Sequence, residues 1–96
     1  MPLEKYYCGD EAFARLAGVP DLDLDAQFEA WHGRQELLAL CGGDSQITRV
    51  VFHVALTHAL EYMKRSIPAL DDLTPVECMK TDWGRRRFKE CLMRSP

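Results

Sequence analysis

The three histidines are the side chains best suited to metal binding or acid–base chemistry, and their spacing favours neither role. His53 and His58 are five residues apart, which places them on different sides of a helix. Two metal ligands on one helix face would stand three or four residues apart instead. His32 follows Trp31 and has no obvious partner in the sequence. We therefore expect His53 and His58 to lie within or beside the core, and we predict no metal site.

The four cysteines are scattered along the chain at Cys8, Cys41, Cys78 and Cys91. They form no Cys-x-x-Cys pair, and no histidine stands at zinc-finger spacing from them. A zinc site assembled from distant residues is the alternative. Reduced, mostly buried thiols that act as small apolar side chains fit this pattern better.

Catalytic patterns are also missing from the sequence. Gly42-Gly43-Asp44-Ser45 opens a helix in the way that anion sites do, but it lacks the lysine of a P-loop, and a helix stop followed by a helix start explains it. No Ser/His/Asp arrangement and no paired-carboxylate pattern is recognisable. We predict a protein that is not an enzyme and that needs no cofactor.

The densest charge in the chain comprises Arg85, Arg86, Arg87, Lys89 and Arg94. A solvated outer face on the last helix is the simplest interpretation. The functional interpretation is a surface that faces an acidic protein or nucleic acid. Trp83 and Phe88 lie nearby, and we assign both to the core rather than to base stacking.

Charge is distributed unevenly between the two halves of the chain. Residues 1–46 hold nine acids and three bases, a net charge of −6, and residues 47–96 hold six acids and nine bases, a net charge of +3, which together give −3. We expect each half to solvate its own outer face and the halves to attract each other weakly. An acidic chain is a poor general partner for nucleic acid, because phosphate contacts supply most of that affinity.

The elements that must position these residues all have helical spacing. Ninety-six residues form one domain, 1–96, and no apolar run is long enough to span a bilayer. The first residues lack the basic and apolar segments of a signal peptide, which predicts a cytoplasmic protein. The fold class that we predict is all-α, a small bundle of about five helices.

The expected helices follow from apolar spacing and from Gly, Pro and capping residues. They are a first helix capped by Asp10 and closed by Gly18; a second from Asp23 or Asp25 toward Cys41, which Gly33 bends or splits; a long central helix from about 46 to 65; a short helix from Pro75; and a last helix from Asp82 to about Arg94. The central helix is apolar over most of its circumference, so the others should pack around it.

Two helix starts stand only seven residues apart in the C-terminal half. Thr74-Pro75-Val76-Glu77 has the order of a capping box, and Thr81 or Asp82 offers a second N-cap just before Gly84. Gly84 shares the inward face of the last helix with Phe88 and Leu92. We expect another backbone or a ring to approach Gly84 closely, and the Gly84/Phe88/Leu92 face to pack on the central helix.

The stretch from Tyr62 to Leu92 resembles the toxin-binding domain of the Xre/MbcA/ParS antitoxins. The residues that carry the resemblance are Tyr62-Met63, where the family shows an aromatic–leucine pair, the Pro68-Ala69-Leu70 step, Thr74-Pro75 opening a short helix, Thr81-x-x-Gly84, and a last helix with spaced apolar residues. The match covers about residues 46–94, roughly half of the chain. Asp71-Asp72 stand where the family commonly has two glycines, and Tyr62 stands where tryptophan is common.

The resemblance implies a partner-binding protein. Such antitoxins bind RES-domain toxins, which use or consume NAD, and cover the entrance to the toxin's active site. Pro68, Leu70, Thr74, Pro75 and Gly84 then have an architectural role. The toxin-facing residues are on the last helix, Arg85, Arg86, Lys89, Met93 and Arg94.

Two alternative functions remain open. One is a small DNA-associated regulator that uses Arg85, Arg86, Arg87 and Lys89 on phosphates. The other is reuse of the same fold as an inhibitor or adaptor of an unrelated protein. The acidic residues 1–45 contain no recognisable helix-turn-helix or basic recognition helix, so nucleic acid is the disfavoured partner.

Self-association is a further expectation. Phe28, Trp31, Leu37, Leu38 and Leu40 crowd the second helix of a chain too short to bury every large side chain. An exposed apolar strip usually marks an interface. We predict a homodimer to which the acidic N-terminal half or the central helix contributes.

Overall fold

The computed structural model describes residues 9–94, and within that range every regular element is a helix. The elements are α1 (Asp10–Ala17), α2 (Leu22–Ala30), α3 (Arg34–Leu40), α4 (Ser45–Ala55), η2 (Leu56–His58), α5 (Ala59–Met63), η3 (Pro68–Leu70), α6 (Pro75–Cys78) and α7 (Asp82–Met93), where η marks a 3₁₀ helix. The predicted all-α class is confirmed.

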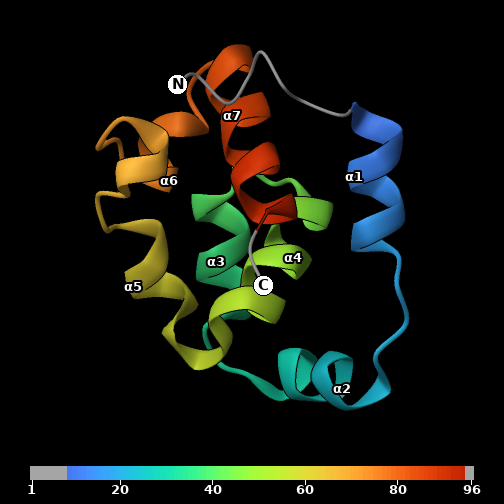
Figure 1. The fold of residues 1–96 in the computed structure, drawn as a ribbon. Helices are drawn as coiled ribbons and strands as arrows, with labels where there is room; N and C mark the ends of the chain where they lie inside the picture. Colours follow the sequence, from blue (N-terminus) through green and yellow to red (C-terminus); the bar gives the residue numbers. More distant parts are fainter. Residues whose placement is uncertain (1–8, 95–96) are drawn as a thin grey trace.

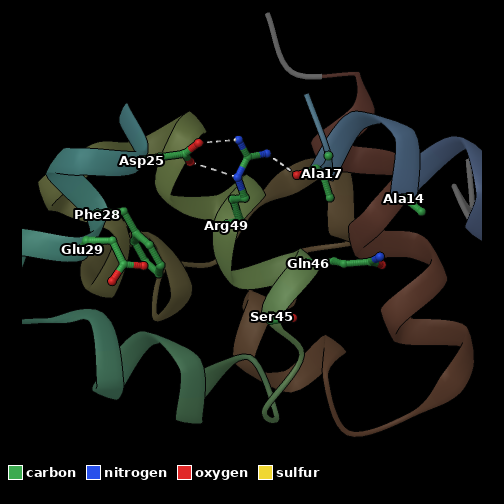
Figure 2. A pocket seen from close by; sticks show the side chains of 9 residues that line it. Ala14, Ala17, Asp25, Phe28, Glu29, Ser45, Gln46 and Arg49 are labelled. Atoms are coloured by element: carbon green, nitrogen blue, oxygen red, sulfur yellow. Dashed lines mark hydrogen bonds and ion pairs between the residues drawn. The ribbon is translucent and has the colours of Figure 1, made fainter. Parts of the chain in front are cut away.

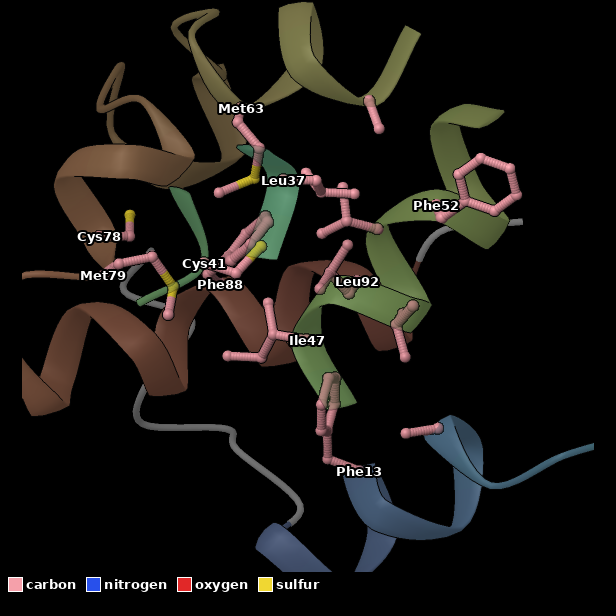
Figure 3. Close-up of a cluster of buried hydrophobic side chains, with 14 of the residues drawn as sticks. Phe13, Leu37, Cys41, Ile47, Phe52, Met63, Cys78, Met79, Phe88 and Leu92 are labelled. Atoms are coloured by element: carbon pink, nitrogen blue, oxygen red, sulfur yellow. The ribbon is translucent and has the colours of Figure 1, made fainter. Parts of the chain in front are cut away.

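Helix α4 lies at the centre of the molecule (Figure 1). It contacts α1, α2, α3, α5 and α7, and its Ile47, Val51 and Phe52 side chains are buried. These side chains belong to one apolar cluster with Phe13 from α1, Leu37 from α3 and Leu92 from α7. Figure 3 shows Ile47 among the labelled side chains of this cluster and Phe52 farther along α4. The other helices thus pack around this segment, as its apolar circumference predicts.

The central helix is shorter than expected. The prediction of one helix over about 46–65 is wrong in its continuity, because α4 ends at Ala55 and the chain passes through η2 before α5 begins. The break is at Leu56, whose φ of 54° and ψ of −133° belong to a region that glycine occupies far more easily. Such a backbone conformation costs about 1–3 kcal/mol in a residue with a side chain.

The second expected helix is split at Gly33 into α2 and α3. Gly33 is the N-cap of α3, and a Cβ atom there would lie 2.5 Å from the Trp31 ring. Helix α2 buries no residue completely, but Phe28 and Trp31 reach the Phe52 ring of α4 at centroid distances of 5.1 and 5.3 Å. Aromatic contacts of this kind fix α2 on the core.

The apolar strip expected on the second helix is not exposed. Leu37 is fully buried, and Phe28, Trp31 and Leu40 are half-buried against the core. The large apolar side chains that are exposed lie elsewhere, at Leu16, Val19, Leu22, Val54, Leu56 and Trp83. The apolar side chains of the second helix therefore do not form the exposed strip from which we predicted a homodimer.

The helix starts depend on side-chain caps, with two shifts from the expected positions. Asp10 is the first residue of α1 and not its cap, because Gly9 is the N-cap. Helix α2 begins at Leu22, where Asp21 accepts a hydrogen bond from the Leu24 amide at 3.1 Å. Asp44 caps α4, with its carboxylate 3.0 Å from the Ile47 amide. Each such cap stabilises its helix by about 1 kcal/mol.

The two closely spaced helix starts are both confirmed. Thr74 and Glu77 form the reciprocal capping box of α6, with hydrogen bonds of 3.1 and 3.0 Å. The Thr81 hydroxyl then accepts a hydrogen bond from the Gly84 amide at 3.0 Å and caps α7. Because each start satisfies amides that would otherwise lack partners, two helices can follow each other within one short stretch.

Gly84 is buried where α6 and α7 meet. A Cβ atom at this position would lie 2.4 Å from the Cys78 carbonyl oxygen. The close approach of another backbone is therefore confirmed, and the approaching segment is the end of α6. Phe88 and Leu92, farther along the same face, reach the core cluster with α4.

We predict that Gly84→Ala destabilises the protein by about 1–3 kcal/mol, because the added methyl group overlaps backbone that cannot move aside freely. For a domain of this size each kcal/mol lowers Tm by roughly 4–8 °C. Thermal melts of Gly84→Ala and of Arg86→Ala, an exposed control on the same helix, measure the effect. A Tm that rises for Gly84→Ala would mean that only helix propensity matters at this position.

Candidate partner-binding surface

The basic residues of α7 form the surface with the densest charge, and helical spacing decides which of them share a side. Arg86, Lys89 and Met93 follow at intervals of three and four, so they line one outer face of α7. Arg86 is exposed, whereas Met93 is half-buried against the core. We call Arg86, Lys89 and Met93 the α7 face.

Arg85 and Arg94 lie beside the α7 face and contact their own surroundings. The Arg85 guanidinium donates to the Met79 carbonyl at 3.2 Å and lies 3.4 Å from the Asp82 carboxylate. The Arg94 guanidinium lies 2.7 Å from the Glu90 carboxylate one turn earlier. The Arg85–Asp82 pair is exposed and contributes little stability, so a partner can recruit Arg85 at small cost. Glu90 is buried, so recruitment of Arg94 would cost more.

Lys89 joins the last helix to the first. Its ammonium group lies 3.1 Å from the Asp10 carboxylate and 5.2 Å from the centre of the Phe13 ring. Its side chain is only 14% exposed. Sequence reasoning missed Asp10 as part of this site because the two residues are far apart in the chain.

Arg87 does not belong to the basic surface. It is buried, and its guanidinium lies 3.0 Å from the Asp71 carboxylate, 3.4 Å from the Leu70 carbonyl and 4.9 Å from the centre of the Trp83 ring. Trp83, which was assigned to the core, is instead 44% exposed and covers Arg87 from outside. The four bases proposed for phosphate contacts therefore do not lie on one surface.

An open, charged depression of about 230 Å³ lies between the N-terminus of α1 and α7. It is lined by Asp10, Asp82, Arg85, Arg86 and Lys89. Three bases and two acids leave it a net charge of only +1. Such a mixed surface matches polar and acidic groups of a folded protein better than a phosphate backbone, which needs several unopposed cations.

Four of the five architectural residues lie beside α7, and the fifth, Gly84, is in its first turn. Pro68 begins η3, and Leu70 is fully buried at its end. Thr74 and Pro75 start α6, and both η3 and α6 contact α7. We call η3, α6 and the connection between them the corner, because this segment reverses the chain and orients α7.

An open pocket of about 490 Å³ lies between α1, α2 and α4 (Figure 2). Arg49 extends from α4 into it and pairs with the Asp25 carboxylate at 3.0 and 3.1 Å. The same guanidinium donates to the Ala17 and Val19 carbonyls at the end of α1. Since its donors are occupied within the chain, Arg49 connects three helices and is not a ligand-binding group.

In residues 9–94 the histidines and thiols do not come together in a metal-binding cluster. The His53 imidazole lies 3.4 Å from Asp25 and is half-buried, whereas His58 is exposed beside Glu61 rather than near the core. Cys41 and Cys78 are buried, burial raises the pKa of Cys41 to about 11, and Cys8 lies outside the described residues. Within residues 9–94 no three His, Cys, Asp or Glu side chains gather closely enough to hold a metal ion.

Comparison of the chain with protein-family models, with curated proteins and with solved structures finds no match. In the part of the chain that the structure describes, no helix has the length and apolar composition needed to cross a bilayer.

The Asp25–Arg49 pair predicts a pH-dependent contribution to stability. Hydrogen bonds from Arg49 hold the pKa of the Asp25 carboxyl below its usual value. A carboxyl group with a lowered pKa stabilises the fold above its unfolded-state pKa, and this contribution is lost as the pH falls through the folded-state pKa. We therefore expect Asp25→Asn to lower Tm at pH 7 and to have a shrinking effect below about pH 4.

Thermal melts across this pH range test the prediction, with Asp23→Asn as an exposed control on the same helix. The Tm of the control should follow that of the unmodified protein at every pH. An Asp25→Asn effect that persists undiminished in acid would contradict an electrostatic origin.

Proposed function

We propose that this chain is a non-enzymatic, antitoxin-like protein that binds and neutralises another protein, with a RES-type, NAD-consuming toxin as the leading candidate. The observation that carries the proposal is the backbone at Asp71 and Asp72. Both residues are left-handed, with φ values of 56° and 65°. These are the two positions at which the antitoxin family commonly has glycines, and glycine adopts such φ values most easily.

The rest of the corner and Gly84 of α7 support the same proposal. The proline–small–leucine step forms η3, Thr74-Pro75 opens α6 through a capping box, and Gly84 permits the close contact of α6 with α7. These three motif elements thus lie where they can orient α7. An orienting role is what a binding face on α7 requires, because a preorganised helix loses little entropy when it binds.

The α7 face supports a protein partner rather than nucleic acid. The depression beside it has a net charge of +1, and Arg87 is turned inward to Asp71. The whole chain has a net charge of −3. A partner that presents a carboxylate to Arg86 and an apolar group to Met93 has the chemistry that complements this face. We also propose that the chain forms a homodimer.

The direct test is co-expression with the product of the neighbouring open reading frame. We expect that product to be toxic alone, to be tolerated in the presence of this chain, and to be retained with it in a pull-down. A neighbour that is neither toxic nor retained would contradict the antitoxin assignment. A complex with DNA that weakens steeply as salt increases would favour the regulator instead.

Arg86→Glu gives a residue-level prediction for the same interaction. Because Arg86 is exposed, the substitution should leave Tm nearly unchanged, but it should weaken capture of an acidic partner by about tenfold. Titration of the purified partner measures the change in Kd. Arg65→Glu is the matched control, because Arg65 is also exposed but lies outside the α7 face. Equal effects of the two variants would indicate only long-range electrostatics.

A further inference from the structure

The sequence at the bend between α4 and α5 contains no glycine or proline that would favour a bend. Leu56 adopts φ 54° and ψ −133°, which is close to the first central position of a type II′ turn, where glycine is the usual residue. Its side chain is 42% exposed, and Thr57 and His58 are also exposed. Burial of Leu56 therefore does not compensate for the unfavourable backbone.

The flanking sequence favours a straight helix instead. Neither glycine nor proline occurs between Gly43 and Pro68, and the strong helix formers alanine, leucine, glutamate and methionine are common after the bend, in residues 59–63. Nearly every residue from Ser45 to Met63 is helical apart from the short η2 segment. A continuous helix over 45–63 would be about 28 Å long. Local propensity and the observed bend are therefore in conflict.

The bend persists because the segments on its two sides pack on each other. We call residues 9–55 the N-terminal unit and residues 59–94 the C-terminal unit. The contacts between the units include those of α7 with α1 and α4, of α5 with α3, and of α5 with α4 next to the bend. They include the ion pairs of Lys89 with Asp10 at 3.1 Å and of Lys64 with Glu36 at 3.8 Å.

A straight α4–α5 helix would separate the two units of one chain. The C-terminal unit could no longer reach its own α1, α3 and α4, and core residues such as Met63, Phe88 and Leu92 would be exposed. The same surfaces are, however, available on a second copy whose units are separated in the same way. Two chains can thus restore the contacts of α7 with α1 and α4 and of α5 with α3, while each removes its Leu56 bend.

We propose that this chain forms a domain-swapped homodimer in which residues 59–94 are exchanged and residues 45–63 become one helix. The partner is a second copy of the chain, because only a second copy carries surfaces complementary to both separated units. Exchange of identical elements is a low-cost route to dimers, since the contacts are already optimised in the monomer. This inference does not depend on the proposed antitoxin function, and the two fail in different experiments.

The test compares Leu56→Gly with Leu56→Ala. Both variants remove the same exposed side chain, but only glycine relieves the strained backbone of the bent monomer, and only alanine keeps high helix propensity for the straight form. After refolding at high protein concentration, sedimentation velocity measures the dimer. We expect the unmodified chain and Leu56→Ala to dimerise, and Leu56→Gly to associate about 10- to 100-fold more weakly, because each dimer straightens two bends.

Hydrogen exchange on the isolated dimer distinguishes a swap from side-by-side association. In a continuous helix the amides of Thr57 and His58 bond the carbonyls of His53 and Val54, so both amides should exchange more slowly in the dimer than in the monomer. Dimers of the unmodified chain with unprotected amides here would overturn the proposal. So would a chain that remains monomeric after concentrated refolding, or equal association of the Gly and Ala variants.

Discussion

The burial of α4 is the constraint on which the rest of the structure depends. Its apolar side chains point to several sides, so no single neighbouring helix can cover them. A chain of 96 residues meets this requirement only with short helices placed on different sides of α4, as Figure 1 shows. Short helices have little stability of their own, which explains why capping side chains recur at Asp21, Asp44, Thr74 and Thr81.

Several charges of the basic half of the sequence form ion pairs with the acidic half. Arg49 pairs with Asp25, Lys64 with Glu36 and Lys89 with Asp10, so bases of the C-terminal half repeatedly meet acids of the N-terminal half. Weak long-range attraction between the halves was expected from the sequence, and the structure adds these direct pairs. The Lys89–Asp10 pair reduces the basic character of α7, and what remains there is a small mixed surface around Arg86. Specificity on such a surface comes from the geometry of a few groups, not from a strong field.

Features set by neighbouring residues could be predicted from the sequence, and features set by distant contacts could not. The capping box, the Thr81 cap and the close approach at Gly84 follow from local spacing, and all three are present. The burial of Arg87 depends on Asp71 across the corner, and the place of Lys89 depends on Asp10 at the other end of the chain. The exposed position of Trp83 follows from the same inward turn of Arg87, which the tryptophan ring covers. From the sequence alone, Arg87, next to the apolar stripe of α7, could have pointed either to solvent or inward.

Leu56 is the position at which local and distant interactions disagree most clearly. Sequences that fold to one state usually have local preferences that agree with the global fold. Here the preference of residues 45–63 for a continuous helix is overridden by packing between the two units. Packing of that kind constrains which surfaces meet but not whether they belong to the same molecule. A glycine at position 56 would have removed the disagreement. With leucine there, the domain swap that we propose is a second solution to the same packing problem, and a high protein concentration should favour it.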